Sequence, residues 1–410
     1  MKFEFYCICK IRRSVSCLKS KVSPSSRSRR NVAKPLPDDA RKRERGRKRS
    51  HSREASKKKD VRRKKKRSKE EEKLVQVGDT IHRRYDVNRV LGEGSFGHVL
   101  QCDDRQTGRI VAVKAIKPLD RDNYRNSSRH EMNVLVKLND FSKSCKNSYC
   151  IEALEFFEWN KLYFIVFPKL GDSVFNFIQN NKYQPFSVGQ STSIVHQLCS
   201  AVKYFNKLRL CHTDLKPENI LFVDSAYEEI RQDNRKIYRR ILDTQIKVID
   251  FGSATFEDEH HSRTIQTRHY RAPEVVLELG WSYPADVWSI GCILYELLTG
   301  KCMFMTHDNL EHLAMMERII GPIPKEMIRQ SPKTSLFYKG RLDWNTSSSD
   351  DQYVRKHLKP LGQYWFKSFD RQFRLAFDLI REMLVYQPCK RLHIQDAFSH
   401  PFLQSVDVQC

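Results

Sequence analysis

The chain has 410 residues, which is enough for two domains or for one large domain of two lobes with a sizeable core. The composition argues against a membrane protein, because no apolar run approaches the ~20 residues of a membrane-spanning helix. The 12 cysteines show no C-x₂-C pair and no His/Cys spacing typical of metal ligands, which argues against a structural zinc site and suits a reducing compartment.

The positive charge is concentrated at the N-terminus. Residues 1–73 contain 29 Lys/Arg and 9 Asp/Glu, and so supply +20 of the total formal charge of +25. Residues 12–73 lack Phe, Tyr and Trp, so this segment cannot bury enough apolar surface to offset the entropy of ordering. We therefore predict that residues 1–80 form a disordered tail rich in Arg, Lys and Ser.

The sequence leaves several roles open for this tail. Residues 57–67 resemble a nuclear-import signal, and the charge also suits acidic or phosphorylated protein partners. Contact with RNA would be weak and salt-sensitive, because a tail without aromatic side chains can bind phosphates but cannot stack on bases. A simple solvated tail is the remaining alternative.

Two lobes are predicted beyond the tail, at residues 81–170 and 171–405. From Tyr85 to Lys117 apolar and polar residues alternate between turn signals, as in antiparallel strands. Another short strand is expected at 162–167. Helical apolar spacing is clearest at 125–138, 187–208, 284–299, 309–320 and 371–386. The fold class is therefore α+β, with a small antiparallel-sheet lobe, one main helix in it, and a larger helical lobe.

A glycine-rich motif lies among the predicted strands. Its residues are Leu91, Gly92, Glu93, Gly94, Ser95, Phe96, Gly97 and Val99. The G-x-G-x-x-G spacing alone is weak evidence, because dinucleotide-binding folds share it. Here a strand-like stretch follows and leads to the V-A-V-K string containing Ala112 and Lys114, which favours a loop over ATP phosphates. Glu131 is the expected partner of Lys114, and an ordinary surface position is its alternative.

The motifs that carry chemistry lie further along the chain. In H-T-D-L-K-P-E-N, Asp214 can accept the proton of an attacking hydroxyl, Lys216 can neutralise a γ-phosphate, and Asn219 can hold a metal ion. Asp250 begins a D-F-G string, and its carboxylate suits Mg²⁺, which prefers oxygen ligands. Asn219 and Asp250 are thus the predicted metal ligands.

Three other residues are expected to be structural. Glu274 closes an A-P-E string that resembles the end of a kinase activation segment. That resemblance implies that Arg391 pairs with Glu274 and that Asp286 supports the catalytic loop from a buried position. A buried ion pair of this kind fixes geometry more than it adds net stability.

Together these motifs resemble a eukaryotic protein kinase from Tyr85 to about Leu403. Three strings are similar to those of the LAMMER, or CDC-like, kinases: E-H-L-A-M-M-E-R at 311–318, the H-T-D form of the catalytic loop, and T-R-H-Y-R-A-P-E at 267–274. The helix over 311–320 also fits plain core packing, and no chemical role follows for it.

The resemblance implies ATP and Mg²⁺ as cofactors and a nuclear dual-specificity kinase, with the cytoplasm as a second location. Its substrates would be Ser residues of Arg/Ser-rich splicing factors, so that it regulates pre-mRNA splicing, and it would autophosphorylate on Ser, Thr and Tyr. It implies Phe167 at the back of the adenine pocket, with Pro168 and Leu170 in the hinge. Neither membrane attachment nor an obligate oligomer is expected.

Three features qualify this resemblance. Thr213 replaces the arginine of the common H-R-D, which suggests an activation segment that is competent without phosphorylation. The charged stretch 225–245 resembles a family insertion of unknown role. Glu218 and the acidic run 257–259 are candidates for binding substrate arginine, or they are simply solvated.

A pseudokinase scaffold is the alternative function, although all residues needed for chemistry are present.

Overall fold

The computed structural model describes residues 75–94, 97–116, 121–142, 149–231, 237–367 and 370–404. These residues belong to one compact unit, Leu74–Cys410. The import-like segment 57–67, most of the predicted tail, and Ser95 and Phe96 lie outside the described residues. Within the part of the chain that is described, no helix has the length and apolar character needed to span a membrane.

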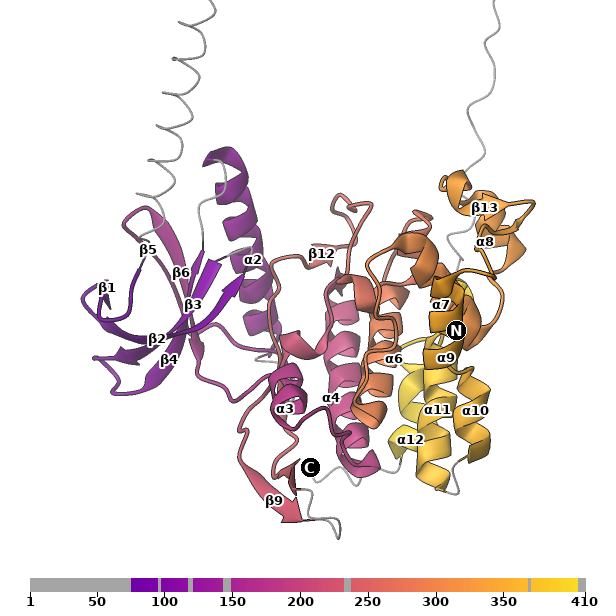
Figure 1. The fold of residues 1–410 in the computed structure, drawn as a ribbon. Coiled ribbons are helices and arrows are strands. Elements are labelled where there is room, and N and C mark those ends of the chain that lie inside the picture. Colours follow the sequence, from indigo (N-terminus) through magenta and orange to yellow (C-terminus); the bar gives the residue numbers. More distant parts are fainter. Residues whose placement is uncertain are drawn as a thin grey trace, which may run out of the picture. The chain divides into compact units, whose positions relative to one another are not determined.

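The small lobe is built on a six-stranded antiparallel sheet with the order β1-β2-β3-β4-β6-β5 (Figure 1). Its strands are β1 (Thr80–Ile81), β2 (Tyr85–Gly94), β3 (Gly97–Asp104), β4 (Ile110–Ile116), β5 (Glu155–Trp159) and β6 (Leu162–Pro168). Alternating residues such as Leu100, Val113 and Phe164 fill an apolar layer on one face. Val134 and Leu135 of helix α2 (Arg121–Ser142) belong to the main core together with Ile165 of β6.

The larger lobe is mainly helical. Its helices are α3 (Val174–Asn180), α4 (Val188–Lys207), α5 (Pro273–Val276), α6 (Pro284–Thr299), α7 (Asn309–Ile320), α8 (Lys325–Gln330), α9 (Ser349–His357), α10 (Leu361–Lys367), α11 (Arg371–Met383) and α12 (Pro401–Gln404). Helix α6 is buried along nearly its whole length and lies between α4 and α11. Its sequence is accordingly mostly apolar, and its polar residues Asp286, Ser289 and Glu296 are buried with it.

Among the residues that the structure describes, four short strand pairs complete the larger lobe. They are formed by β7 (Leu210–Cys211) with β12 (Thr255–Phe256), β8 (Ile220–Phe222) with β11 (Ile246–Val248), β9 (Tyr227–Arg231) with β10 (Ile237–Ile241), and β13 (Phe337–Tyr338) with β14 (Arg341–Leu342). The chain between β7 and β8 carries the catalytic-loop motif, and the chain after β11 carries Asp250. Pairing of these strands therefore brings the two motifs close together.

Local capping signals explain where several helices begin and end. The side chain of Asp308 accepts hydrogen bonds from the N–H groups of Leu310 and Glu311 at the start of α7. Gly300 ends α6 with φ 66°, and a Cβ there would lie 1.9 Å from Tyr183 O, so only glycine fits. The bounds of α6 and α7 coincide with the predicted ones, whereas α2 extends beyond the predicted 125–138 at both ends.

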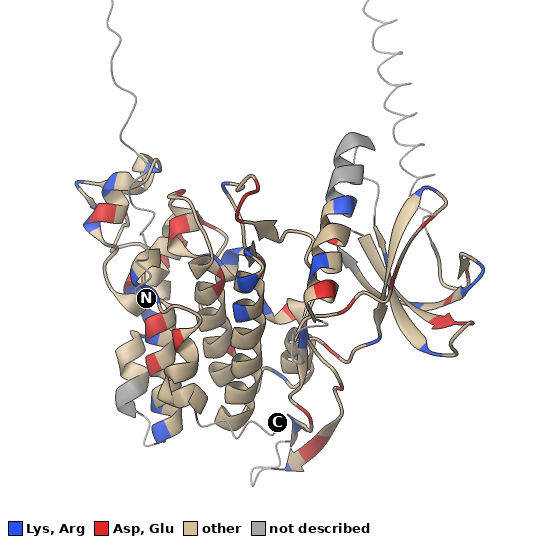
Figure 2. Cartoon of the chain, turned by 180° about the vertical axis from the view of Figure 1, so that it is seen from behind, with Lys and Arg blue, Asp and Glu red and all other residues tan. Residues whose placement is uncertain are grey.

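The stretch 225–245 contains the hairpin of β9 and β10. The side chain of Asn181 attaches it to the end of α3 through both backbone groups of Arg239, at 2.7 and 2.8 Å. The Arg239 guanidinium lies 4.3 Å from the centre of the Tyr227 ring. Positive and negative side chains are both distributed over the two lobes (Figure 2), in contrast to the strongly basic composition of residues 1–73.

Candidate active site

A buried charge cluster joins three elements. Nζ of Lys114, on β4, lies 2.6 Å from Oε1 of Glu131 on α2 and 3.0 Å from Oδ1 of Asp250. The side chains of Lys114 and Glu131 are 10% and 5% exposed. The partner predicted for Lys114 is therefore present, and the sheet, helix α2 and the larger lobe meet at this lysine.

Attraction between opposite charges outweighs burial at Lys114 and Asp250, whereas burial dominates at Glu131 and raises the pKa of that carboxyl. Burial by itself would lower the pKa of Lys114, but attraction to Glu131 and Asp250 outweighs it and raises the pKa. Burial would likewise raise the pKa of Asp250, but Lys114 outweighs it and lowers the pKa. The lysine therefore stays a cation and Asp250 an anion at neutral pH, as binding of phosphate and of a metal ion requires.

The glycine-rich loop connects β2 to β3. The strand register places Val99 opposite both Gly92 and Lys114, so the first glycine of the motif and the lysine lie in one row across β2, β3 and β4. A Cβ on Gly97 would lie 2.1 Å from Ala115 O, so the β3–β4 approach demands glycine. At Gly92 a Cβ would meet nothing within 4 Å, which leaves room for a phosphate beside the backbone. Leu91, Glu93 and Gly94 lie in the same strand, and the side chain of Glu93 lies outside the described part of the structure.

The hinge follows β6. Phe167 pairs with Ala112 across β4 and β6, which places the predicted adenine-pocket residue beside the alanine of the V-A-V-K string. Pro168 is the last residue of β6, and Leu170 is buried. The ammonium of Lys169 donates to the Leu170 carbonyl.

Asp214, Lys216 and Thr267 form a hydrogen-bonded triangle. Thr267 donates to Oδ1 of Asp214 from both its N–H, at 2.9 Å, and its hydroxyl, at 2.7 Å. Nζ of Lys216 lies 2.7 Å from the other carboxylate oxygen and donates to the Thr267 hydroxyl at 3.0 Å. This arrangement fixes the orientation of the Asp214 carboxylate before any substrate binds.

Buried contacts beneath the triangle hold the catalytic loop. The fully buried carboxylate of Asp286 accepts the backbone N–H groups of His212 and Thr213 at 2.8 and 3.0 Å. Thr213 has φ 67°, so this residue is in a strained left-handed conformation that the two hydrogen bonds help to impose. Glu274 and Arg391 form the expected ion pair, with two contacts of 2.7 Å.

Asn219 and Asp250 fit a divalent cation. The amide nitrogen of Asn219 donates to the Asp214 carbonyl at 2.9 Å, which orients the side chain and leaves Oδ1 as its acceptor oxygen. Asp250 offers carboxylate oxygens, of which Lys114 contacts one. Amide and carboxylate oxygens are the ligands that a hard cation prefers.

Two features near the catalytic loop were not found from sequence. Gln266 is buried with φ 65°, its side chain donates to Ala285 O and Ser289, and its carbonyl accepts from Arg271. Glu296, on α6, accepts the Tyr270 hydroxyl at 2.7 Å. Neither has a sequence signal that separates it from an ordinary core residue.

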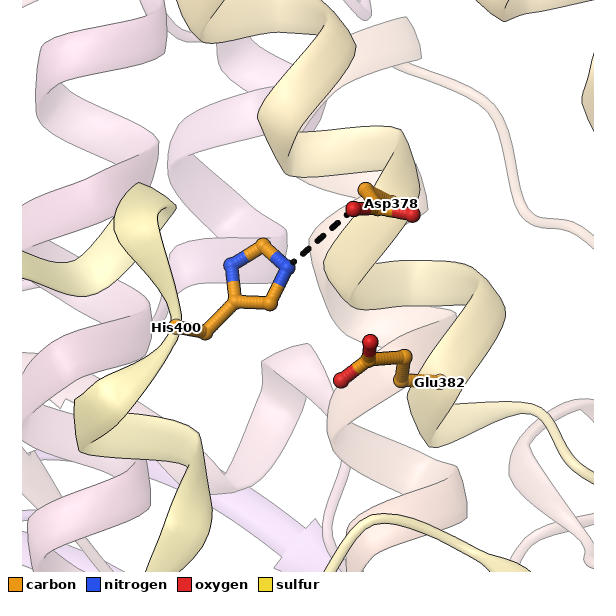
Figure 3. Close-up of side chains that lie close together, drawn as sticks. All are labelled: Asp378, Glu382 and His400. Carbon is orange, nitrogen blue, oxygen red and sulfur yellow. Dashed lines mark ion pairs between the residues drawn. The ribbon is translucent and has the colours of Figure 1, made fainter.

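Asp378, Glu382 and His400 also lie together (Figure 3), with one ligand atom of each within 4.8 Å of the others. However, the N–H of Phe402 donates to Nδ1 of His400 at 3.2 Å, so the neutral ring carries its proton on Nε2, which faces Asp378 at 3.6 Å. A histidine that binds a metal through Nε2 donates from its other nitrogen instead. We therefore assign this group as a polar contact between α11 and the chain before α12, not as a metal centre.

Comparison with known proteins agrees with this geometry. The protein kinase domain family matches residues 85–403. The dual specificity protein kinase CLK2 of Homo sapiens is 48% identical over 331 residues, covering 80% of this chain and 66% of CLK2. The serine/threonine-protein kinase Doa of Drosophila melanogaster is 46% identical over 336 residues, covering 80% of this chain and 40% of Doa. A crystal structure of a kinase domain matches with a TM-score of 0.72 and 33% identity, covering 80% of this chain and 98% of that one.

The two-lobed fold and the site around Lys114, Asp214 and Asp250 are those of a protein kinase, a class that uses ATP and a divalent metal ion. Within this class, the chain belongs to the LAMMER, or CDC-like, family of dual-specificity kinases, as its motifs predicted. The aligned part spans two thirds or less of the length of CLK2 and Doa.

Proposed function

We propose that this chain transfers the γ-phosphoryl group of Mg·ATP to serine and threonine hydroxyls of protein substrates, and to tyrosine in itself. When bound, Mg²⁺ would neutralise charge on the phosphates. Lys114 orients the nucleotide, while Asn219 and Asp250 hold the metal. Asp214 accepts the proton of the attacking hydroxyl, and Lys216 stabilises the transferred group. Positioning and electrostatics thus account for the catalysis.

We further propose that the preferred substrates carry arginine next to the phosphorylated serine. The observation that supports this is Glu218, four residues after Asp214. Its Oε2 is buried and has no hydrogen-bond partner among the described residues, and burial raises its pKa. An unpaired buried carboxylate oxygen is costly, and an arriving guanidinium would remove this cost.

Glu296 adds a second carboxylate to this region. Burial raises its pKa to about 7, opposed by the Tyr270 hydroxyl and reinforced by the nearby charge of Glu218. Two carboxylates that repel each other beside the catalytic loop form an acceptor for a cation. The acidic run 257–259 is a poorer candidate, because Glu257 accepts from Tyr283 and Glu259 contacts His130 and the N–H of Phe256.

Serines flanked by arginine occur in Arg/Ser-rich splicing factors, so we propose these proteins as substrates and regulation of pre-mRNA splicing as the role. The import-like composition of residues 57–67 supports a nuclear location. The basic tail remains a candidate for docking acidic or phosphorylated partners or, weakly, RNA.

Substituting the two carboxylates tests the arginine preference. Glu218→Gln and Glu296→Gln are each expected to raise KM for an Arg/Ser peptide about tenfold, with a small change in kcat, because a charge-assisted hydrogen bond to substrate is lost. A peptide with Lys in place of Arg should lose less, since lysine cannot bind both oxygens of a carboxylate in parallel. Initial rates measured over a range of peptide concentrations give both constants.

Glu326→Gln is the matched control, because Glu326 is an exposed carboxylate on α8. Unchanged KM in both Glu218→Gln and Glu296→Gln would remove these residues from substrate recognition. Mass spectrometry of the products shows whether serine is the modified residue. Equal activity toward acidic peptides would contradict the splicing-factor proposal but not the kinase activity.

The raised pKa of Glu296 predicts a dependence on pH. Below pH 7 this carboxyl is mostly neutral, and above it is charged, so attraction for arginine increases as pH rises. We expect kcat/KM for an Arg/Ser peptide to increase between pH 6 and pH 8, since kcat/KM reports groups of the free enzyme. Glu296→Gln should remove this part of the profile, and a profile of wild-type shape in the variant would contradict the assignment.

A further inference from the structure

Helix α2 contacts the activation segment, Asp250–Glu274, through His130. Nε2 of His130 lies 2.6 Å from the carbonyl oxygen of Ala254, and Nδ1 lies 3.3 Å from Oε1 of Glu259. Both ring nitrogens thus face oxygen acceptors, and each of them can donate where it carries a hydrogen. His130 precedes Glu131 in the sequence, so the same turn of α2 carries this contact and the partner of Lys114.

Glu259 is itself fixed within the activation segment. Its other oxygen, Oε2, accepts the N–H of Phe256 at 2.9 Å, and its own N–H donates to Phe256 O at 3.1 Å. Phe256 belongs to β12, which pairs with β7 immediately before the catalytic loop. A displacement of Glu259 would therefore be transmitted to the loop that carries Asp214.

A second contact lies two helical turns along α2. Nζ of Lys137 is 4.0 Å from the centre of the Phe256 ring, which is within the range of a cation–π interaction. Residues seven apart lie on the same face of a helix, so His130 and Lys137 present one side of α2 to the activation segment. Figure 1 shows this helix beside β12.

We propose that Glu259 and His130 form a carboxylate–imidazole contact that fixes α2 on the activation segment without phosphorylation of that segment. His130 is then a positioning residue, which acts on the reaction through Glu131 and Lys114. The carboxylate of Glu259 is part of the polypeptide, so forming the contact requires no added phosphate group. This inference rests on the proposed kinase activity.

The environment of Thr213 supports this assignment. Its hydroxyl donates to the Ser253 carbonyl at 2.7 Å, so the catalytic loop contacts the activation segment through a neutral hydrogen bond. A threonine provides no positive charge to hold a phosphate. His130 and Glu259 instead provide a contact between α2 and the activation segment that needs no modification.

The test uses His130→Phe, which keeps a ring of similar size and removes both donors, and His130→Arg, whose guanidinium can donate to both oxygens. We expect His130→Phe to lower kcat about tenfold, the effect of losing the hydrogen bonds that hold α2 on the activation segment, with KM for the peptide changed less than about twofold. His130→Arg should retain most of the wild-type kcat. Asn133→Ala, exposed on the same helix, is the control and should match wild type.

Glu259→Gln provides an independent variant on the other side of the contact. It should lower kcat by a smaller factor, because the amide can still accept from Phe256 but no longer carries charge. In the double variant with His130→Phe, kcat should fall no further than in His130→Phe alone, since paired residues act as a unit. Independent, multiplicative losses in kcat would contradict the pairing.

Two other measurements separate this inference from the proposed function. Hydrogen exchange of the α2 amides should be faster in His130→Phe than in wild type and in Asn133→Ala, whether or not a peptide substrate is found. Phosphatase-treated wild-type enzyme should keep most of its initial rate. The inference would be overturned if His130→Phe kept the kcat of the wild-type enzyme, or if phosphatase treatment abolished the activity of the wild-type enzyme. The kinase proposal would be overturned if the untreated wild-type protein phosphorylated neither any peptide nor itself.

Discussion

Replacing Asp250 with alanine is expected to lower kcat about 10³-fold, because the chain loses the one carboxylate that both contacts Lys114 and is assigned to the metal ion. The loss should appear in kcat and in kcat/KM together, as for an interaction needed in the transition state. The loss of kcat is measured by incubating each enzyme with Mg·ATP and an Arg/Ser peptide and counting the phosphorylated serines by mass spectrometry.

This substitution should leave the fold intact. The Asp250 side chain is 32% exposed, and Lys114 keeps its contact with Glu131 in the variant. The thermal midpoint of unfolding should therefore stay close to that of wild type. Activity above about a tenth of wild type would mean that Asp250 does not hold the metal. If the thermal midpoint of Asp250→Ala falls sharply, the kinetic loss reflects unfolding, and Asp250→Asn is measured in place of Asp250→Ala.

The largest expected effect on stability comes from the ion pair between Glu274 and Arg391. Their side chains are 1% and 0% exposed, and two parallel contacts of 2.7 Å join them. Glu274→Ala would leave a buried guanidinium without its anion, which costs about 3–5 kcal/mol. Denaturant titration should show this decrease in the free energy of unfolding.

The matched control is Glu228→Ala, which removes the partner of Arg240 in the β9–β10 hairpin. That pair is 53% and 41% exposed, so water and salt screen it and the unfolding midpoint should not change. Equal effects of the two substitutions would mean that burial does not determine the strength of the Glu274–Arg391 pair. A neutral replacement of both Glu274 and Arg391 should destabilise less than Glu274→Ala alone.

Elements with local signals at both ends were predicted most accurately. Helix α6 has Pro284 in its first turn and Gly300 after its last, and α7 has Asp308 as its N-cap and Gly321 at its end. The catalytic residues were also identified from sequence, because phosphoryl transfer needs particular side chains at fixed short spacings. Their roles stay predictions until the kinetics above are measured.

The sequence by itself determined the family, the two-lobed fold and the candidate catalytic residues, since periodicity, caps and short motifs depend on neighbours along the chain. Only the tertiary structure showed that Glu296 lies near Glu218 and that His130 contacts Glu259. Each of these pairs joins residues more than 70 positions apart. The strength of their electrostatic interaction depends on how deeply they are buried, which spacing along the chain does not show. Alone in the sequence, each of these side chains is indistinguishable from an ordinary polar residue of a helix or loop.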